Sequence, residues 1–120
     1  MDLLQRFYRS ELDDIFRSWG AHAADFEWLA KNIIYGMFFS DEGVLDTIET
    51  ELIVYTAIAC QDLRTPTRRH LRGLRRFGVS LEDVEAITEC VKLVAEWAGK
   101  DTGDWVGIRE FEPDFEQDRD

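Results

Sequence analysis

Large apolar residues recur every three or four positions through the first third of the chain. Between residues 2 and 19 they follow a helical spacing, and Gly20 ends the run. These residues are Leu4, Phe7, Tyr8, Leu12, Ile15, Phe16 and Trp19. A second apolar run begins at Phe26 and predicts a helix up to about Tyr35 and Gly36. We therefore expect two amphipathic helices before the loop SDEGVLD.

The next apolar segment, LIVYTAIAC at residues 52–60, suits a buried strand as well as a buried helix. Asp46, followed three positions later by Glu49, resembles a helix start in which each residue caps the other. The pattern from there is long enough to favour a helix. We predict a buried central helix over about residues 47–61.

Two further helices are predicted after the central one. Thr65 is expected as the N-cap and Pro66 as the first residue of the next helix, which closes at Gly78. Ser80 and Asp83 open the last long helix in the same way. Its apolar residues recur at spacings of three and four: Leu81, Val84, Ile87, Val91, Val94 and Ala98.

A helix is favoured for every one of these segments, so the sequence predicts an all-α protein built as a small helical bundle. Its 120 residues lie within the size range of one domain. We expect a single helical domain over residues 1–108, closed by a packed turn around Trp105. Residues 109–120 are expected to form an acidic C-terminal tail.

Composition narrows the choice of partners and compartment. The formal net charge of −11 disfavours nucleic acid and anionic membrane as partners, because phosphates must be met by a positive field. No stretch approaches about 18 uncharged apolar residues, so we expect no transmembrane helix. The opening residues, MDLLQRF, lack the pattern of a secretory signal. A cytoplasmic protein is therefore the default expectation.

The two cysteines, Cys60 and Cys90, are 30 positions apart in a chain of 120 residues. Neither has the close cysteine or histidine neighbours of a zinc site or a redox pair. We interpret both as small buried apolar residues, and we expect neither a metal nor a cofactor.

One histidine stands out within the helix predicted over residues 66–77. A helical wheel places five arginines on one side: Arg68, Arg69, Arg72, Arg75 and Arg76. His70 falls in the middle of the opposite side, among Thr67, Leu71, Leu74 and Phe77. In an acidic protein the arginines are best interpreted as a solvated face or as ion-pair partners for neighbouring subunits.

A carboxylate occupies a similar place on the central helix, where Glu51 shares a stripe with Val54, Tyr55 and Ile58. If the two helices pack as an antiparallel hairpin, Glu51 and His70 face one another or share a water. A neutral imidazole oriented by a buried carboxylate is a ready proton acceptor near pH 7. The competing interpretation is that His70 is a hydrogen-bonded core residue without a catalytic role.

From Tyr35 onward the sequence resembles the carboxymuconolactone decarboxylase and alkylhydroperoxidase-like superfamily. The string YGMFFSDEGVLDTIETELIVYTAIAC is similar to the family's aromatic-glycine turn, its loop and its central helix. The string HLRGLRRFGVSLEDVEAITECVKLVAEWAG is similar to its histidine helix and the helix after it. The resemblance covers about residues 26–99, and it implies an all-α fold that assembles as trimers or hexamers.

The resemblance also implies roles for particular residues. Glu51 and His70 match the proton relay of the peroxidase members. Apart from the resemblance, Tyr55 is a candidate for a second proton donor, with a purely packing role as the alternative. Leu63 and Pro66 stand where those members carry their Cys-x-x-Cys pair, which excludes thiol peroxidase chemistry.

The lactone decarboxylase members differ from this chain in another way. Met37, Asp41 and Thr50 stand where they carry a glutamate and substrate-binding arginines, so a dianionic substrate fits poorly. Met37 with the following Phe38 and Phe39 favours a small, fairly hydrophobic substrate.

Three functions remain open at this point. The leading one is cofactor-free acid/base chemistry on a small carbonyl, lactone or β-keto acid, by decarboxylation, isomerisation or ring closure. The second is a non-catalytic member of the family that binds a ligand or serves in assembly. The third is a DNA-binding helix-turn-helix, which four acids on its second helix argue against because phosphates would repel them. These acids are Glu82, Asp83, Glu85 and Glu89.

Overall fold

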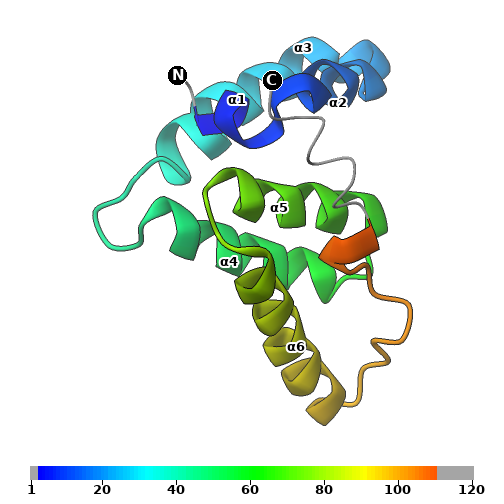
Figure 1. The fold of residues 1–120 in the computed structure, drawn as a ribbon. Coiled ribbons are helices and arrows are strands. Elements are labelled where there is room, and N and C mark those ends of the chain that lie inside the picture. Colours follow the sequence, from blue (N-terminus) through cyan, green and yellow to red (C-terminus); the bar gives the residue numbers. More distant parts are fainter. Residues whose placement is uncertain (1–2, 111–120) are drawn as a thin grey trace. The chain divides into compact units, whose positions relative to one another are not determined.

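The structure is a computed structural model that describes residues 3–110. The chain is all-α, as predicted, and this described range contains no β-strand (Figure 1). It divides into two compact units, Met1–Thr50 and Glu51–Asp120. The single domain predicted over residues 1–108 stays a prediction. Of the predicted acidic tail, only Arg109 and Glu110 lie within the described residues.

The first unit begins with two short helices where the sequence predicted one. Helix α1 (Leu3–Tyr8) and helix α2 (Leu12–Ser18) are separated by the 3-10 turn η1 (Arg9–Glu11). The prediction of one continuous helix was wrong because the Arg9 backbone takes the left-handed conformation, with φ of +45°. Apolar residues on both sides of the break still share one cluster, which contains Leu4, Leu12, Phe16 and Tyr35.

The second half of this unit is one long helical stretch with a change of pitch. After the turn η2 (Gly20–His22), helix α3 (Ala23–Trp28) runs directly into the π-helix η3 (Leu29–Phe38). A Cβ atom at Gly36 would lie only 2.3 Å from the Lys31 carbonyl oxygen, so the wide π-turn requires glycine at this position. The second predicted helix is confirmed, although it continues beyond Gly36.

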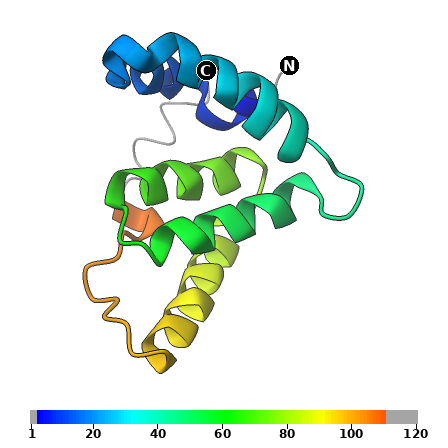
Figure 2. The same ribbon diagram turned by 180° about the vertical axis from the view of Figure 1, so that it is seen from behind.

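The second unit is built from three longer helices. Helix α4 (Thr47–Ala59) enters it from the first unit and is followed by α5 (Arg64–Arg76) and α6 (Leu81–Trp97). Helices α4 and α5 lie side by side, and α6 crosses them (Figures 1 and 2). The buried core of this unit consists of Tyr55, Ala59, Leu71, Leu74, Val84, Val106 and Ile108.

Local hydrogen bonds confirm two of the predicted helix starts. The Glu49 amide donates to Asp46 Oδ1 at 2.8 Å, and the Asp46 amide donates to Glu49 Oε2 at 2.9 Å. This is the reciprocal cap predicted for the central helix. At the start of α6, the Asp83 amide donates to the Ser80 hydroxyl at 3.1 Å.

The start of α5 differs from the prediction. Its N-cap is Leu63, whose side chain makes no capping bond, and the helix begins at Arg64 instead of Pro66. Thr65 is therefore inside the helix, and the prediction of Thr65 as N-cap was wrong. Pro66 is still in the first turn, where its missing N–H costs no helical hydrogen bond.

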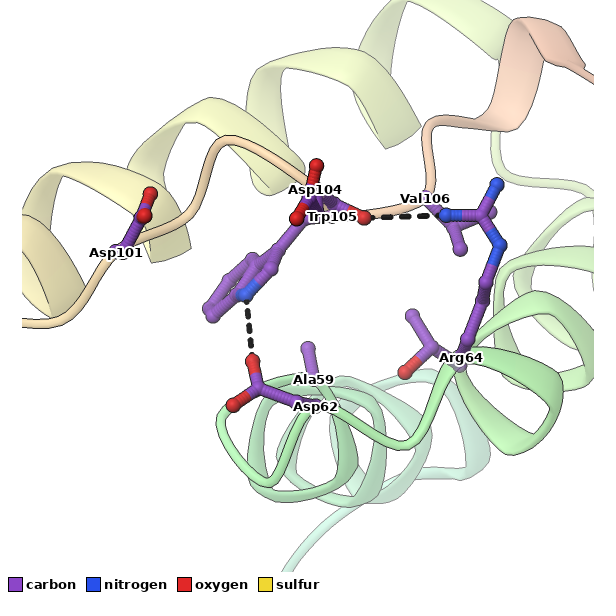
Figure 3. Close-up of a pocket in the computed structure, with 8 residues that line it drawn as sticks. Ala59, Asp62, Arg64, Asp101, Asp104, Trp105 and Val106 are labelled. Atoms are coloured by element: carbon purple, nitrogen blue, oxygen red, sulfur yellow. Dashed lines mark hydrogen bonds between the residues drawn. The ribbon is translucent and has the colours of Figure 1, made fainter.

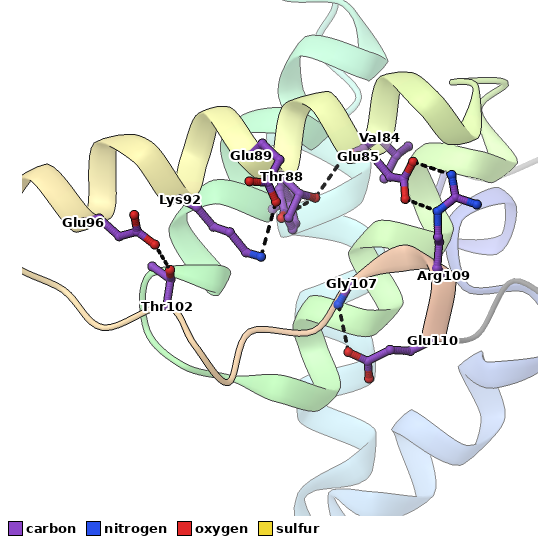
Figure 4. A network of polar contacts seen from close by, with 11 residues as sticks. Val84, Glu85, Thr88, Glu89, Lys92, Glu96, Thr102, Gly107, Arg109 and Glu110 are labelled. Carbon is purple, nitrogen blue, oxygen red and sulfur yellow. Dashed lines mark hydrogen bonds and ion pairs between the residues drawn. The ribbon is translucent and has the colours of Figure 1, made fainter.

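A short 3-10 turn, η4 (Ile108–Glu110), closes the described chain against α6. Both oxygens of Glu85 accept from the Arg109 guanidinium, with a distance of 2.7 Å for Nη2 to Oε2 (Figure 4). Further along α6, Glu96 accepts a bond from the Thr102 hydroxyl. These bonds fasten the segment after α6 to the side of that helix, along which it runs back.

Burial corrects several expectations about single residues. Cys60 and Cys90 are both exposed, so the prediction that they are buried was wrong. Arg72 is only 8% exposed, so the expected solvated face does not extend over the whole arginine side of α5. Val94 is 66% exposed because the last turns of α6 project beyond the core formed with α4 and α5 (Figure 1). Among residues 3–110, the helices are either too short or too polar to span a bilayer.

Candidate acid/base site

Glu51 and His70 meet in the core of the second unit. Glu51 lies in the first turns of α4 and His70 lies midway along α5, and these two helices form the hairpin that the sequence analysis assumed. The Glu51 Oε1 atom lies 2.8 Å from His70 Nδ1. The predicted encounter of the two side chains is therefore confirmed, while their catalytic role stays a prediction.

Burial favours the uncharged forms of both Glu51 and His70. Each residue is 3% exposed. Burial raises the pKa of Glu51 to about 10. The pKa of His70 is lowered to about 4, mainly by burial and then by the nearby positive charge of Arg69. At pH 7 the pair therefore holds a neutral carboxylic acid and a neutral imidazole, whereas the sequence suggested an ionised carboxylate.

These protonation states set the direction of the hydrogen bond. A protonated Glu51 donates to His70 Nδ1, so the ring proton of the neutral imidazole is on Nε2. In this form the imidazole offers a proton at Nε2. Once Nε2 gives up its proton, the Glu51 proton can move to Nδ1 and leave Nε2 able to accept one. The pair can thus act first as a general acid and then as a general base.

Tyr55 lies one turn beyond Glu51 on α4 and is fully buried. Its hydroxyl lies 3.1 Å from the Thr88 hydroxyl. Thr88 donates its own proton to the Val84 carbonyl at 2.9 Å, so Tyr55 must be the donor to Thr88 (Figure 4). Burial also raises the pKa of the Tyr55 phenol. This arrangement fixes α4 to α6 and keeps the phenolic proton within the core.

The three predicted substrate-binding residues lie in the first unit, at the end of η3. Met37 is 59% exposed and Phe38 is 66% exposed. The Phe39 ring is partly buried and packs edge-on against Tyr35, with 5.2 Å between ring centroids. The apolar character of this segment is as predicted, and its contact with a substrate stays a prediction.

A cavity that the sequence analysis missed lies beside the start of α5. It measures about 380 Å³ and is formed by the end of α4, the start of α5 and residues 101–106 (Figure 3). Neither Glu51 nor His70 lines it. The only sequence signal for this cavity was the turn around Trp105, which supplies one wall. Within residues 3–110, no three His, Cys, Asp or Glu side chains are grouped to hold a metal ion.

The chain matches no protein-family model and no solved structure. It is similar to two curated proteins, each named Peroxisomal protein 2. The protein from Saccharomyces cerevisiae is 32% identical over 66 residues, which are 55% of this chain and 23% of that protein. The protein from Schizosaccharomyces pombe is 28% identical over 80 residues, which are 67% of this chain and 38% of that protein. The similarity thus spans about a quarter to two-fifths of these relatives.

Proposed function

We propose that this chain is a cofactor-independent acid/base enzyme of the carboxymuconolactone decarboxylase-like type, a lyase or an isomerase. The observation that carries the proposal is the 2.8 Å hydrogen bond between Glu51 and His70 in a site where both are 3% exposed. Burying a carboxyl and an imidazole costs free energy, and titratable groups with strongly shifted pKa values cluster at functional sites.

The chemistry follows from the protonation states of the pair. The His70 Nε2–H donates to the oxygen of a carbonyl or lactone as negative charge develops there. The Glu51 proton moves to Nδ1 in the same step, so the imidazole stays neutral instead of becoming a buried anion. The negative charge is left on the Glu51 carboxylate. The reverse transfer takes a proton from the product side. This exchange suits decarboxylation, isomerisation or ring closure of a small β-keto acid, lactone or carbonyl compound.

The remaining residues bear on the kind of substrate. The exposed apolar side chains of Met37 and Phe38, together with the partly buried Phe39, support a fairly hydrophobic substrate over a dianionic one. Leu63 and Pro66, in the place of a Cys-x-x-Cys pair, support a reaction other than thiol peroxidation.

Self-association as a trimer or hexamer belongs to the same proposal. The apolar residues of α1 and α2 are largely used in the core of the first unit. The last turns of α6 instead expose Leu93, Val94 and Trp97, which is 89% exposed. Exposed apolar side chains in a cluster are a common feature of subunit contacts and support assembly.

A second function is a binding or assembly protein without catalysis. Two observations favour it: both members of the pair are almost completely buried, and neither lines the cavity found in the second unit. In that case the Glu51–His70 bond would serve to hold α4 against α5.

The two candidates are distinguished by a substrate screen. Small β-keto acids, lactones and enolisable ketones are incubated with the protein and with His70→Gln, and reaction is followed by NMR. A reaction that the wild type accelerates and His70→Gln does not supports the enzyme, provided the variant keeps its circular dichroism spectrum. Equal rates for both proteins on a turned-over substrate would assign the pair to the structural role.

The proposed location is the cytoplasm, as the sequence suggested. The name of both relatives makes the peroxisome the competing location. Fractionation of the source cells with antibodies against this chain separates the two.

A further inference from the structure

The cavity beside α5 is bordered by charged groups of both signs, but most are already paired. Arg64 donates to the Asp104 carbonyl at 3.1 Å and to the Glu110 carboxylate at 3.0 Å. Asp62 accepts from the Lys100 ammonium at 2.7 Å and from the Trp105 indole N–H at 3.1 Å. These contacts neutralise one another and fix the walls of the cavity.

Two carboxylates on the loop side of the cavity are not paired with a cation among the described residues. Asp101 accepts one bond from the Gly103 amide at 2.9 Å and has no cationic partner among the described residues. No side chain or amide within residues 3–110 bonds to the Asp104 carboxylate. Figure 3 shows both residues on the segment that faces Ala59, Asp62 and Arg64 across the cavity. The uncompensated charge at this cavity is therefore negative.

The interior of the cavity adds an independent sign of a ligand. Thr67 lines the cavity and is only 5% exposed. Its hydroxyl bonds to none of the described residues, so it is available to bond to a molecule in the cavity. The neighbouring walls are apolar, formed by Ala59, Val106 and the Trp105 ring. A molecule seated here would meet apolar walls, one hydroxyl to bond and two carboxylates at the rim.

We propose that this cavity binds a small organic amine, with its ammonium group at Asp101 and Asp104 and its carbon chain against Trp105 and Val106. The volume of about 380 Å³ lies in the range of small-molecule sites. The indole face of Trp105 would add attraction for the cation. The Thr67 hydroxyl would bond to a polar group at the inner end of the ligand. This binding is separate from the proposed acid/base chemistry, because the cavity excludes Glu51 and His70.

The test uses putrescine as the probe and the full chain. The Trp105 indole N–H signal in a ¹H–¹⁵N spectrum, assigned by its absence in Trp105→Phe, reports on the cavity. Putrescine should shift this signal in a saturable way, whereas 1,4-butanediol and succinate, at the same concentrations, should not. A shift by succinate, or one by butanediol as large as that by putrescine, overturns the proposal.

Variants separate a built site from general attraction to an acidic protein. Asp101→Asn and Asp104→Asn should each weaken putrescine binding about threefold and together about tenfold. Thr67→Val, which keeps the side-chain shape, should also weaken it about threefold without destabilising the fold. Glu82→Gln removes an exposed acid of α6 that is not part of the cavity, and it should leave binding unchanged. Equal losses in Glu82→Gln and Asp104→Asn overturn the proposal.

Discussion

The carboxyl of Glu51 and the imidazole of His70 share a proton across a 2.8 Å bond, although 19 positions separate them in the chain. The bond joins α4 to α5. Both groups are neutral at pH 7, because a charge on either one would be costly in a site that water barely reaches. This relationship determines how the stability and the activity of the protein should respond to mutation and to pH.

The first prediction concerns stability above neutral pH. The folded pKa of Glu51 is about 10 against a usual 4.5, so the folded state holds a proton that the unfolded state has lost. Stability should therefore fall as pH rises from about 6.5 towards 10, by at most about 1.4 kcal/mol per pH unit. Below pH 6.5, His70, with its pKa lowered from 6.5 to about 4, contributes an opposite slope that offsets the one from Glu51.

Urea denaturation at pH 7 and pH 9 measures this effect in the wild type and in Glu51→Gln. The variant cannot titrate at this position, so its stability should change less between the two pH values. Identical changes in both proteins would show that Glu51 is already ionised at pH 7.

The second prediction concerns turnover of a substrate found in the screen. His70→Gln should lower turnover by about 10²- to 10⁴-fold with a modest change in substrate affinity. Glu51→Gln should cost less, because the amide can still donate to Nδ1 although it cannot pass on a proton. The double variant should lose less than the sum of the two effects, since the two residues act on one proton. Additive losses would argue against a relay.

Tyr55→Phe should affect stability and leave turnover nearly unchanged. The Tyr55 proton is donated to Thr88 inside the core, so its removal costs about 1 kcal/mol in the free energy of unfolding. Turnover should stay within a few-fold of wild type. A loss of 100-fold or more in a folded Tyr55→Phe protein would mean that the phenol takes part in the chemistry.

Replacement of both cysteines should be harmless. Cys60 and Cys90 are exposed, so Cys60→Ser with Cys90→Ser leaves no cavity and should change the free energy of unfolding by less than about 0.5 kcal/mol. Activity should also remain within a few-fold. Inactivation of a folded double variant would return a thiol to the mechanism.

The last prediction concerns assembly. Size-exclusion chromatography with light scattering should give a mass of three or six chains at tens of micromolar. Trp97→Glu places a charge on a side chain that is 89% exposed and should reduce this mass without loss of helical content. Trp105→Phe, in the cavity wall, serves as the matched control and should not. A monomeric wild type would remove the assembly from the proposal.

The sequence alone determined the features that depend on neighbours a few positions away. The cap between Asp46 and Glu49 and the cap from Ser80 to Asp83 are complete within one helical turn, so the residue types were enough to predict them. Helical periodicity likewise placed Glu51 and His70 on the inner faces of adjacent helices. Their meeting followed once those helices were taken as a hairpin.

Only the tertiary structure decided how much of each helix the rest of the chain covers. Periodicity identifies an apolar face but not its buried length, so Val94 was expected inside and is exposed. Arg72 was expected on a side that faces solvent or a neighbouring subunit, and it is buried within this chain. The apolar pattern did not predict the left-handed turn at Arg9, because the pattern continues on both sides of that residue. The protonation of Glu51 also required the fold, because the pKa of a carboxyl depends on the surrounding water that packing removes.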